Sequence, residues 1–212
     1  MMNRDPSHPP FEAKRSALVL IDMVNHQIHG LDDLLARQGL DGRYFQRRLR
    51  DVTIPNLMAL AAAARTNGSR VVHVRMGSVH DDFADVVPTY REGLRALDAR
   101  DGRWACEVID ELAPAAGDVS LVKSGSGAFS SSALDGVLRN MGIEHVIYTG
   151  VVTPGCVLVT ALVGNDLGYR GYVAADATAC FSDADQLAAE AVLSQGYARV
   201  LPTAACLDLL SG

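Results

Sequence analysis

Six short apolar runs alternate with helical patterns along the chain, and this alternation restricts the fold more than any other feature. The runs cover residues 16–22, 69–75, 118–123, 145–150, 171–176 and 198–202. Each is a nearly continuous series of Val, Ile, Leu and Ala rather than an alternation of apolar and polar residues. Such runs are typical of strands that are covered on both faces, as in a parallel sheet.

The segments between the runs have the periodicity of helices that stop at a glycine. We expect helices over 55–67, 131–141, 156–167 and 183–195, which are followed by Gly68, Gly142, Gly168 and Gly196. A helix, a glycine and then a strand a few residues later are typical of right-handed βαβ units. The pattern predicts an α/β fold of three layers, a doubly wound, mainly parallel six-stranded sheet with helices on both faces. We expect one domain over residues 1–212.

Two long segments, 26–48 and 76–117, fall outside this rhythm. Connections of that length in a compact domain are usually functional or carry small helices of their own. We expect these two segments to determine which substrate the protein binds, and the sequence does not predict their conformation.

The composition excludes several classes of protein. Of 212 residues, 49% are hydrophobic and 21% are charged, as in an ordinary globular protein. The net charge of −6 disfavours a protein that grips nucleic acid phosphates. The uncharged segment 146–165 approaches the length of a membrane span, but it contains glycines and a proline, so we expect a strand, a turn and a buried helix instead of a membrane contact.

The cysteines and the first residues predict a cytoplasmic protein. The four cysteines form no CxxC pair and no other metal-binding spacing, so we expect free thiols in a reducing compartment. The first residues contain no apolar segment of the kind found in secretory signals.

Three reactive side chains fall where the carboxyl ends of strands are predicted, which is where ligands bind in such sheets. Asp22 ends the first run, Lys123 ends the third, and Cys156 follows a Pro-Gly turn after the fourth. Each has an ordinary interpretation alone: a turn former, a surface lysine and a small buried residue. Their coincidence at one edge favours a reactive site. The helix dipole and a nearby ammonium are expected to favour the thiolate of Cys156, and the other thiols, Cys106, Cys180 and Cys206, are expected to be structural.

Three segments resemble the isochorismatase-like cysteine hydrolases. They are ALVLIDMVN (17–25), VKSGSGAFSSSALDGVLRNMGI (122–143) and VIYTGVVTPGCVLVTALVGNDLGY (146–169). The superfamily includes nicotinamidase, N-carbamoylsarcosine amidohydrolase, biuret hydrolase and ureidoacrylate hydrolase. The resemblance covers nearly the whole chain and rests on an Asp, then a Lys, then Gly-x-x-Thr-x-x-Cys.

The resemblance implies a role for each matching residue. Asp22 matches the general base, Lys123 the lysine of the family, and Cys156 the nucleophile. It also implies a cis peptide bond between Val151 and Val152, and an oxyanion hole formed by the backbone N–H groups of Val152 and Cys156. Asp22 then accepts the thiol proton, Lys123 stabilises the thiolate, the sulfur attacks a carbonyl carbon, and water hydrolyses the thioester.

The sequence departs from two branches of the superfamily. Nicotinamidases carry a metal-binding Asp-x-His pair, and the matching positions here are Met76 and Ser78, neither of which is a ligand for a divalent metal. His73 lies within a predicted strand, and His80 alone makes no site, so we expect no catalytic metal and no cofactor. True isochorismatases lack the nucleophile, so Cys156 argues against their activity.

The first motif also differs from its relatives, in a way that bears on the substrate. Gln27 stands where an aromatic residue usually forms one wall of the pocket, which favours a polar, urea-like substrate unless Phe129 or Trp104 replaces that wall. We expect Gln27, Phe129 and Val151 to contact the substrate. Gln195, near a helix end, could reach a substrate carbonyl, although a solvated position is the ordinary interpretation.

We therefore predict a metal-independent cysteine amidohydrolase that cleaves a non-peptide C–N bond of a small amide, of the carbamoyl, ureido or biuret type. A small lactam or another carboxamide is the alternative within the class. A non-catalytic binding or assembly module and a redox thiol are the alternatives outside it, and the second is weakened because no resolving cysteine is near Cys156 in sequence. The resemblance implies a homo-oligomer, a dimer or a tetramer, that takes a small amide and water.

Overall fold

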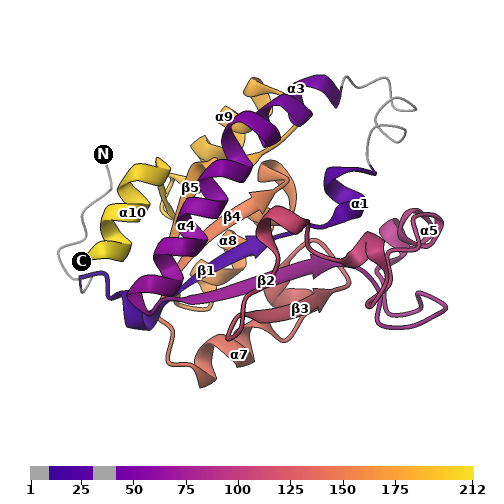
Figure 1. Ribbon diagram of the computed structural model, residues 1–212, viewed down its shortest axis with the longest axis horizontal. Coiled ribbons are helices and arrows are strands. Elements are labelled where there is room, and N and C mark those ends of the chain that lie inside the picture. Colours follow the sequence, from indigo (N-terminus) through magenta and orange to yellow (C-terminus); the bar gives the residue numbers. More distant parts are fainter. Residues whose placement is uncertain (1–9, 31–41) are drawn as a thin grey trace.

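The computed structural model describes residues 10–30 and 42–212, and within them six strands form one sheet in the order β3-β2-β1-β4-β5-β6 (Figure 1). All neighbouring strands are parallel, so the predicted fold class is confirmed. The strands are β1 (Ser16–Ile21), β2 (Arg70–Met76), β3 (Val119–Lys123), β4 (His145–Val151), β5 (Arg170–Ala179) and β6 (Arg199–Leu201).

The continuous apolar runs form strands because both faces of the sheet are covered. Every residue of β1 and of β4, the two central strands, is buried. The pairing of β4 with β5 shifts register between Tyr148 and Gly150, and β5 extends further than the predicted run. The core strands are therefore the segments that the sequence predicts most closely.

Helices of the described residues connect these strands. They are α1 (Asn25–Ile28), α3 (Gly42–Arg48), α4 (Ile54–Asn67), α5 (Pro88–Ala96), α6 (Ala128–Ser131), α7 (Leu134–Asn140), α8 (Leu158–Asp166), α9 (Asp183–Leu193) and α10 (Thr203–Ser211). Five single turns accompany them: η1 (Ala13–Arg15), η2 (Leu49–Thr53), η3 (Trp104–Cys106), η4 (Asp110–Leu112) and η5 (Thr153–Val157).

Two of the four predicted helices begin later than expected, and one helix is missed. The helix expected over 131–141 is divided at Ser132, whose backbone is extended, so that α7 begins only at Leu134. The helix expected over 156–167 begins at Leu158, because Gly155 has non-helical backbone angles. The terminal helix α10 was not expected.

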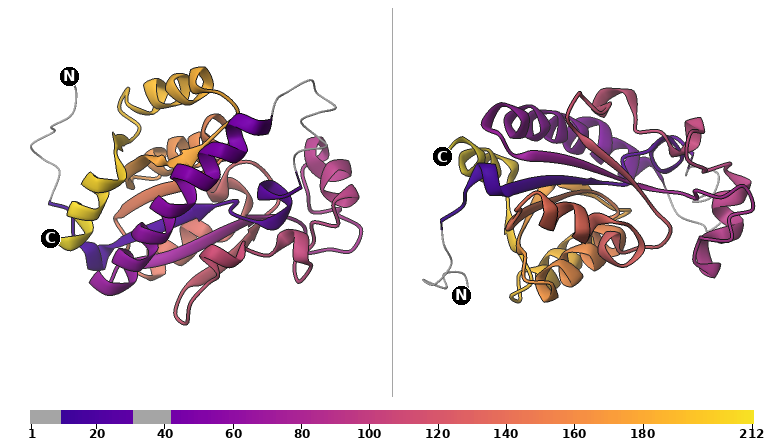
Figure 2. Two further views of the ribbon diagram at one scale, coloured as in Figure 1. Left: turned by 45° about the horizontal axis from the view of Figure 1, so that its top comes forward. Right: turned by 90° about the horizontal axis from the view of Figure 1, so that it is seen from below.

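Helices cover both faces of the sheet (Figure 2). Apolar residues of α4 and α10 share one core with one face of β1 and β5. Residues of α7 and α8 share a second core with the opposite faces of β1, β2 and β4. The three-layer arrangement leaves the carboxyl ends of the strands open to the long connecting segments.

The long segment after β2 forms a small subassembly beside the carboxyl ends of β1 and β2. It carries α5, η3 and η4, and its buried residues form a third core that includes Met76, Phe83 and Leu94. An antiparallel bridge between Val24 and Val108 ties it to the chain that follows β1. The expectation that 76–117 carries small helices is confirmed, whereas part of the segment 26–48, residues 31–41, lies outside the described residues.

The uncharged segment 146–165 is divided among β4, η5 and α8. None of the helices in the described part of the chain is long and apolar enough to cross a membrane.

Candidate active site

Asp22, Lys123 and Cys156 meet at the carboxyl edge of the sheet, although 100 residues lie between the first and the second. Asp22 directly follows β1, Lys123 is the last residue of β3, and Cys156 lies in η5 between β4 and α8. The Lys123 Nζ lies 2.9 Å from Asp22 Oδ2 and 3.3 Å from Cys156 Sγ. The structure therefore brings together the three side chains that the sequence predicts as catalytic.

The ammonium of Lys123 lies at the centre of this group and is fully buried. Burial alone would lower the pKa of Lys123, but the charge of Asp22 and the neighbouring Cys156 raise it above its ordinary value. Nζ also donates a hydrogen bond of 2.8 Å to the carbonyl of Gly125, in the loop that follows β3. Lys123 is therefore a fixed positive charge, not a surface lysine.

The thiol of Cys156 is not predisposed to ionise, and here the sequence-based expectation is wrong. Burial and the negative charge of Asp22 raise the pKa of Cys156 to about 12, although Lys123 acts in the opposite direction. Cys156 lies in η5, between the kink at Gly155 and the start of α8. Ionisation of Cys156 therefore requires a base that takes its proton as the sulfur reacts.

The carboxylate of Asp22 can be that base. It is buried, its Oδ2 is paired with Lys123, and its Oδ1 receives no hydrogen bond from the residues that the structure describes. The backbone of Asp22 has a φ of 56°, in the left-handed region that Asp tolerates better than most residues. This turn lets the chain leave β1 while its amide still donates a 2.8 Å hydrogen bond to Val74 on β2.

The turn that carries Cys156 is held by a contact that sequence reasoning missed. Thr153 donates a 2.7 Å hydrogen bond to Oε1 of Gln186, a buried residue of α9. The Nε2 of Gln186 donates in turn to Thr178 on β5 and to Glu190. A buried glutamine in a helix has no sequence signal that distinguishes it from a surface one, so only the structure identifies this support.

The peptide bond between Val151 and Val152 is cis, as the family resemblance implied. The oxyanion hole that the same resemblance assigns to the N–H groups of Val152 and Cys156 stays a prediction. Val151 is fully buried in the core beside α4 and α10, and its contact with a substrate stays a prediction.

Two residues near Lys123 were not expected to belong to the site. Met76, the last residue of β2, places its Sδ 3.3 Å from Lys123 Nζ. His26, one helical turn beyond Asp22, is buried and its Nε2 lies 2.9 Å from the carbonyl oxygen of Met76. Burial lowers the pKa of His26, which keeps its ring neutral at physiological pH. In the sequence, Met76 is notable only because it matches a position that binds metal in nicotinamidases, and no pattern predicts its contact with Lys123.

The proposed pocket residues lie in different surroundings. Gln27 is half-buried on α1, at the same edge as Asp22. Phe129 is buried in the core and stacks on Tyr169 with 5.2 Å between ring centroids, and its contact with a substrate stays a prediction. Trp104 is 66% exposed, and its ring is stacked near that of His29 after α1.

Three further expectations concern the surroundings of the site. Gln195 is exposed after the end of α9, where the chain turns toward the amino end of β6, so it does not reach a substrate at the opposite edge. Ser78 donates its hydroxyl to Asp85, and His80 is exposed. Among the described residues, no three His, Cys, Asp or Glu side chains gather as potential metal ligands.

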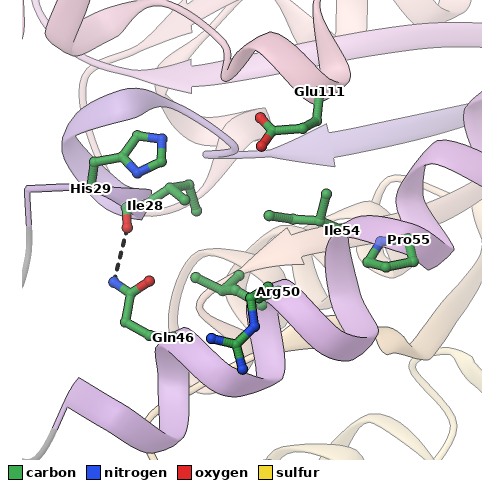
Figure 3. Close-up of a pocket in the computed structure, with 8 residues that line it drawn as sticks. Ile28, His29, Gln46, Arg50, Ile54, Pro55 and Glu111 are labelled. Carbon is green, nitrogen blue, oxygen red and sulfur yellow. Dashed lines mark hydrogen bonds between the residues drawn. The ribbon is translucent and has the colours of Figure 1, made fainter.

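A separate hollow lies between α1, α3 and α4 (Figure 3). Its volume is about 330 Å³, and it is lined by Ile28, His29, Gln46, Leu49, Arg50, Ile54, Pro55 and Glu111. None of the three reactive residues lines it. The chemistry at the carboxyl edge, rather than this hollow, therefore defines the candidate active site.

Comparison with known proteins finds relatives that match most of the chain. Residues 16–205 match the family model of the isochorismatase domain. The ureidoacrylate amidohydrolase RutB of Serratia proteamaculans is 33% identical over 190 residues, which cover 82% of this chain and 73% of that protein.

Solved structures show the same architecture. A cysteine hydrolase from Pseudomonas syringae pv. phaseolicola superposes with a TM-score of 0.81 at 24% identity, covering 97% of this chain and 98% of that one. N-carbamoylsarcosine amidase from Thermoplasma acidophilum has a TM-score of 0.70 at 30% identity, covering 89% and 96% of the two chains.

Proposed function

The chain belongs to the isochorismatase family, and from that premise we propose that it is a cysteine amidohydrolase. It hydrolyses a non-peptide C–N bond in a small carbamoyl or ureido compound through a thioester on Cys156. The observation that carries the proposal is the position of Lys123 Nζ, 2.9 Å from Asp22 Oδ2 and 3.3 Å from Cys156 Sγ. The names of two relatives, a ureidoacrylate amidohydrolase and an N-carbamoylsarcosine amidase, support the substrate class.

The first half of the reaction forms the thioester. Because the thiol has a raised pKa, its proton passes to Asp22 as the sulfur bonds to the carbonyl carbon. Lys123 stabilises the negative charge that develops on the sulfur as its proton leaves, before the C–S bond is complete, and the charge then passes to the carbonyl oxygen. The N–H groups of Val152 and Cys156 are the proposed donors to the carbonyl oxygen, each worth about 2.7–4 kcal/mol in the transition state. The C–N bond breaks, and the proton on Asp22 goes to the leaving nitrogen.

The second half of the reaction regenerates the enzyme. Asp22 takes a proton from a water molecule, the water oxygen bonds to the thioester carbon, and the C–S bond breaks. Asp22 returns its proton to the sulfur, which restores the thiol of Cys156. Each side chain ends in the protonation state in which it began, so the cycle consumes only the amide and water.

Hydrolysis assays with a panel of small compounds test the proposal. The panel contains ureido and carbamoyl acids, biuret, simple carboxamides and lactams, and ammonia or amine release is measured. We expect turnover of a ureido or carbamoyl compound and complete loss in Cys156→Ala. Cys206→Ala, which removes a buried thiol far from the site, is the matched control and should keep its activity.

Each result of the panel decides between stated alternatives. Intact-mass spectrometry after a rapid acid quench should show an adduct on the wild type and none on Cys156→Ala. Turnover of only a lactam or carboxamide would assign the alternative substrate class. Full activity of Cys156→Ala would disprove the thioester mechanism, and binding of ureido compounds without turnover would indicate a binding module.

As part of the same proposal, the protein works in the cytoplasm as a homo-oligomer, either a dimer or a tetramer. All four cysteines are free thiols, which fits a reducing compartment. On α9, Leu187 is 64% exposed and Val192 is 38% exposed, and exposed apolar side chains of this kind are often covered by a subunit contact. Sedimentation equilibrium at several protein concentrations measures the subunit number.

A further inference from the structure

The ammonium of Lys123 has more acceptors than protons. Two oxygens, Asp22 Oδ2 and the carbonyl of Gly125, lie 2.9 and 2.8 Å from Nζ. Two sulfurs, Met76 Sδ and Cys156 Sγ, both lie 3.3 Å from it. A lysine ammonium carries three N–H groups. The two oxygens lie closest to Nζ, and one of them carries the charge of the ion pair. We infer that they take two of the N–H groups, so that the two sulfurs compete for the third.

We propose that the thioether of Met76 holds the third N–H of Lys123 while Cys156 is a thiol, and releases it to the sulfur of Cys156 when the thiol loses its proton. Met76 is therefore a positioning residue that acts through Lys123. The inference rests on the proposed role of Cys156 as the nucleophile and adds how that nucleophile is restrained.

The exchange follows from the strengths of the two acceptors. A neutral thioether and a neutral thiol are both weak acceptors, so the thiol of Cys156 has no advantage and Met76 can hold the N–H before the reaction. After the proton of Cys156 has passed to Asp22, the sulfur is an anion and accepts a charge-assisted hydrogen bond, which is about twice as strong as a neutral one. Lys123 keeps all its protons throughout, and only the direction of one N–H changes.

The backbone fixes the position of the Met76 thioether. Met76 is paired with Lys123 in the ladder between β2 and β3, and the amide of Gly77 donates a 3.0 Å hydrogen bond to the carbonyl of Lys123. The ring of His26 binds the carbonyl oxygen of Met76 from the opposite side. Met76 is 3% exposed, and its side chain packs in the core formed by 83–105. The thioether therefore keeps its distance from Nζ.

The titratable and charged groups that face this point come from several elements. Asp22 follows β1, Cys156 lies in η5, and His26 lies in α1. Cys106 of η3 lies 3.7 Å from the carbonyl oxygen of Met76, and Arg75 of β2 lies beside Cys106. Substitutions that change only Met76 leave all of these groups in place, so a change in the ionisation of Cys156 can be assigned to the lost or strengthened acceptor.

The rate at which iodoacetamide alkylates Cys156 measures that ionisation without any substrate. The rate is followed between pH 7 and 9.5 by mass spectrometry of the peptide that contains Cys156. Met76→Leu conserves volume and removes the acceptor, whereas Met76→Gln replaces it by a stronger amide oxygen. Met23→Leu, at a methionine equally buried in the core beside α4, is the matched control.

We expect opposite effects from the two substitutions of Met76. Without the acceptor, the thiol form loses a contact that the thiolate form does not use, so the pKa of Cys156 falls by about 0.5–1 unit. Because a less basic thiolate is also less nucleophilic, alkylation accelerates roughly two- to threefold in Met76→Leu. Met76→Gln should slow alkylation, and Met23→Leu should leave it unchanged.

Several results would overturn the inference. They are an unchanged or slower rate in Met76→Leu, a change in the same direction in both Met76 variants, or an equal acceleration in Met23→Leu. Circular dichroism melting identifies a variant that does not fold, and the remaining Met76 variant then carries the test by its direction. Alkylation needs no substrate, so the two proposals are tested separately. The alkylation rates of the Met76 variants can contradict this inference while Cys156 is still required for hydrolysis, and they can agree with it even if no hydrolysis is found.

Discussion

The two ends of β3 carry buried charge clusters of opposite character. At the amino end, Asp118 precedes the strand and receives hydrogen bonds from Arg65 at 2.6 Å, from the amide of Ala115 at 2.9 Å, and from His73 at 3.3 Å. At the carboxyl end, Lys123 meets Asp22, and the second oxygen of that carboxylate has no donor among the described residues.

The difference lies in how much hydrogen-bonding capacity is left. Burial would raise the pKa of Asp118, but its hydrogen bonds from Arg65, Ala115 and His73 outweigh burial and lower that pKa, so the carboxylate is saturated and inert. At the other end, Asp22 keeps a free oxygen beside a thiol whose pKa is raised to about 12. A buried ion pair can therefore react when its carboxylate has an oxygen that accepts no hydrogen bond and a neighbouring thiol can donate a proton to it.

The largest expected effect comes from removing the acid at the carboxyl end. Asp22→Asn deletes the proposed general base, and activity should fall by about 10²–10⁴-fold. It also leaves the buried ammonium of Lys123 without its partner, which should lower the free energy of unfolding by about 3–5 kcal/mol. Hydrolysis of the ureido or carbamoyl substrate and urea unfolding measure the two effects.

Asp118→Asn is the matched control for Asp22→Asn. Its side chain is also buried, but its partner Arg65 is about one-third exposed, so the loss of unfolding free energy should be only about 1–2 kcal/mol. Activity should be unchanged. If Asp118→Asn lost activity as strongly as Asp22→Asn, the distinction between a saturated and a reactive cluster would not hold.

An intermediate effect is expected at the turn that carries Cys156. Gln186→Leu keeps a buried side chain of similar size but leaves the hydroxyl of Thr153 without its acceptor and removes one of the two partners of the Thr178 hydroxyl. The unfolding free energy should fall by about 1–3 kcal/mol, and kcat should fall because the turn is less firmly held. Thermal unfolding and kinetics measure both.

Gln195→Leu provides the comparison for Gln186, since Gln195 lies two turns further along and is exposed. Gln195→Leu should change neither the unfolding free energy nor kcat, because the amide of Gln195 is solvated and its removal leaves no buried group without a hydrogen bond. Equal losses in the two variants would show that Gln186 is not a specific support of the turn.

The same contrast explains which features the sequence could predict. The strands and the sites of Asp22, Lys123 and Cys156 followed from local patterns, because strand ends in a parallel sheet meet at one edge. The contacts of Met76 and Gln186 join residues that are 47 and 33 positions from their partners. No periodicity encodes such contacts, so they could not be predicted.

The ionisation of Cys156 and the packing of Phe129 could not be predicted for a related reason. The expectation for Cys156 considered the helix dipole and a nearby ammonium, whereas burial and Asp22, which is distant in sequence, raise the pKa of Cys156. Phe129 is a candidate replacement for the aromatic wall that is lost at Gln27, and the stacking of its ring on Tyr169 could not be predicted either. Side-chain direction is set by packing, which a single sequence does not reveal.

The smallest expected effect concerns pH and the amino end of β3. Burial lowers the pKa of His73 below its ordinary 6.5, although Asp118 acts in the opposite direction. The unfolded chain therefore binds this proton more readily, so stability is complete above about pH 6.5 and decreases as the pH falls below it. Between pH 7.5 and 5.5, His73 should account for a loss of at most about 1.4 kcal/mol.

Urea unfolding of the wild type and of His73→Gln at both pH values measures this contribution. The loss on acidification should be smaller in His73→Gln, while the lowered pKa values of His26 and His145 keep part of it in both proteins. A larger loss in the variant would mean that protonated His73 is stabilised by Asp118 more than burial penalises it. In that case the carboxylate of Asp118 could also strengthen its interaction with a proton donor, and the saturation of its hydrogen bonds would no longer distinguish it from Asp22.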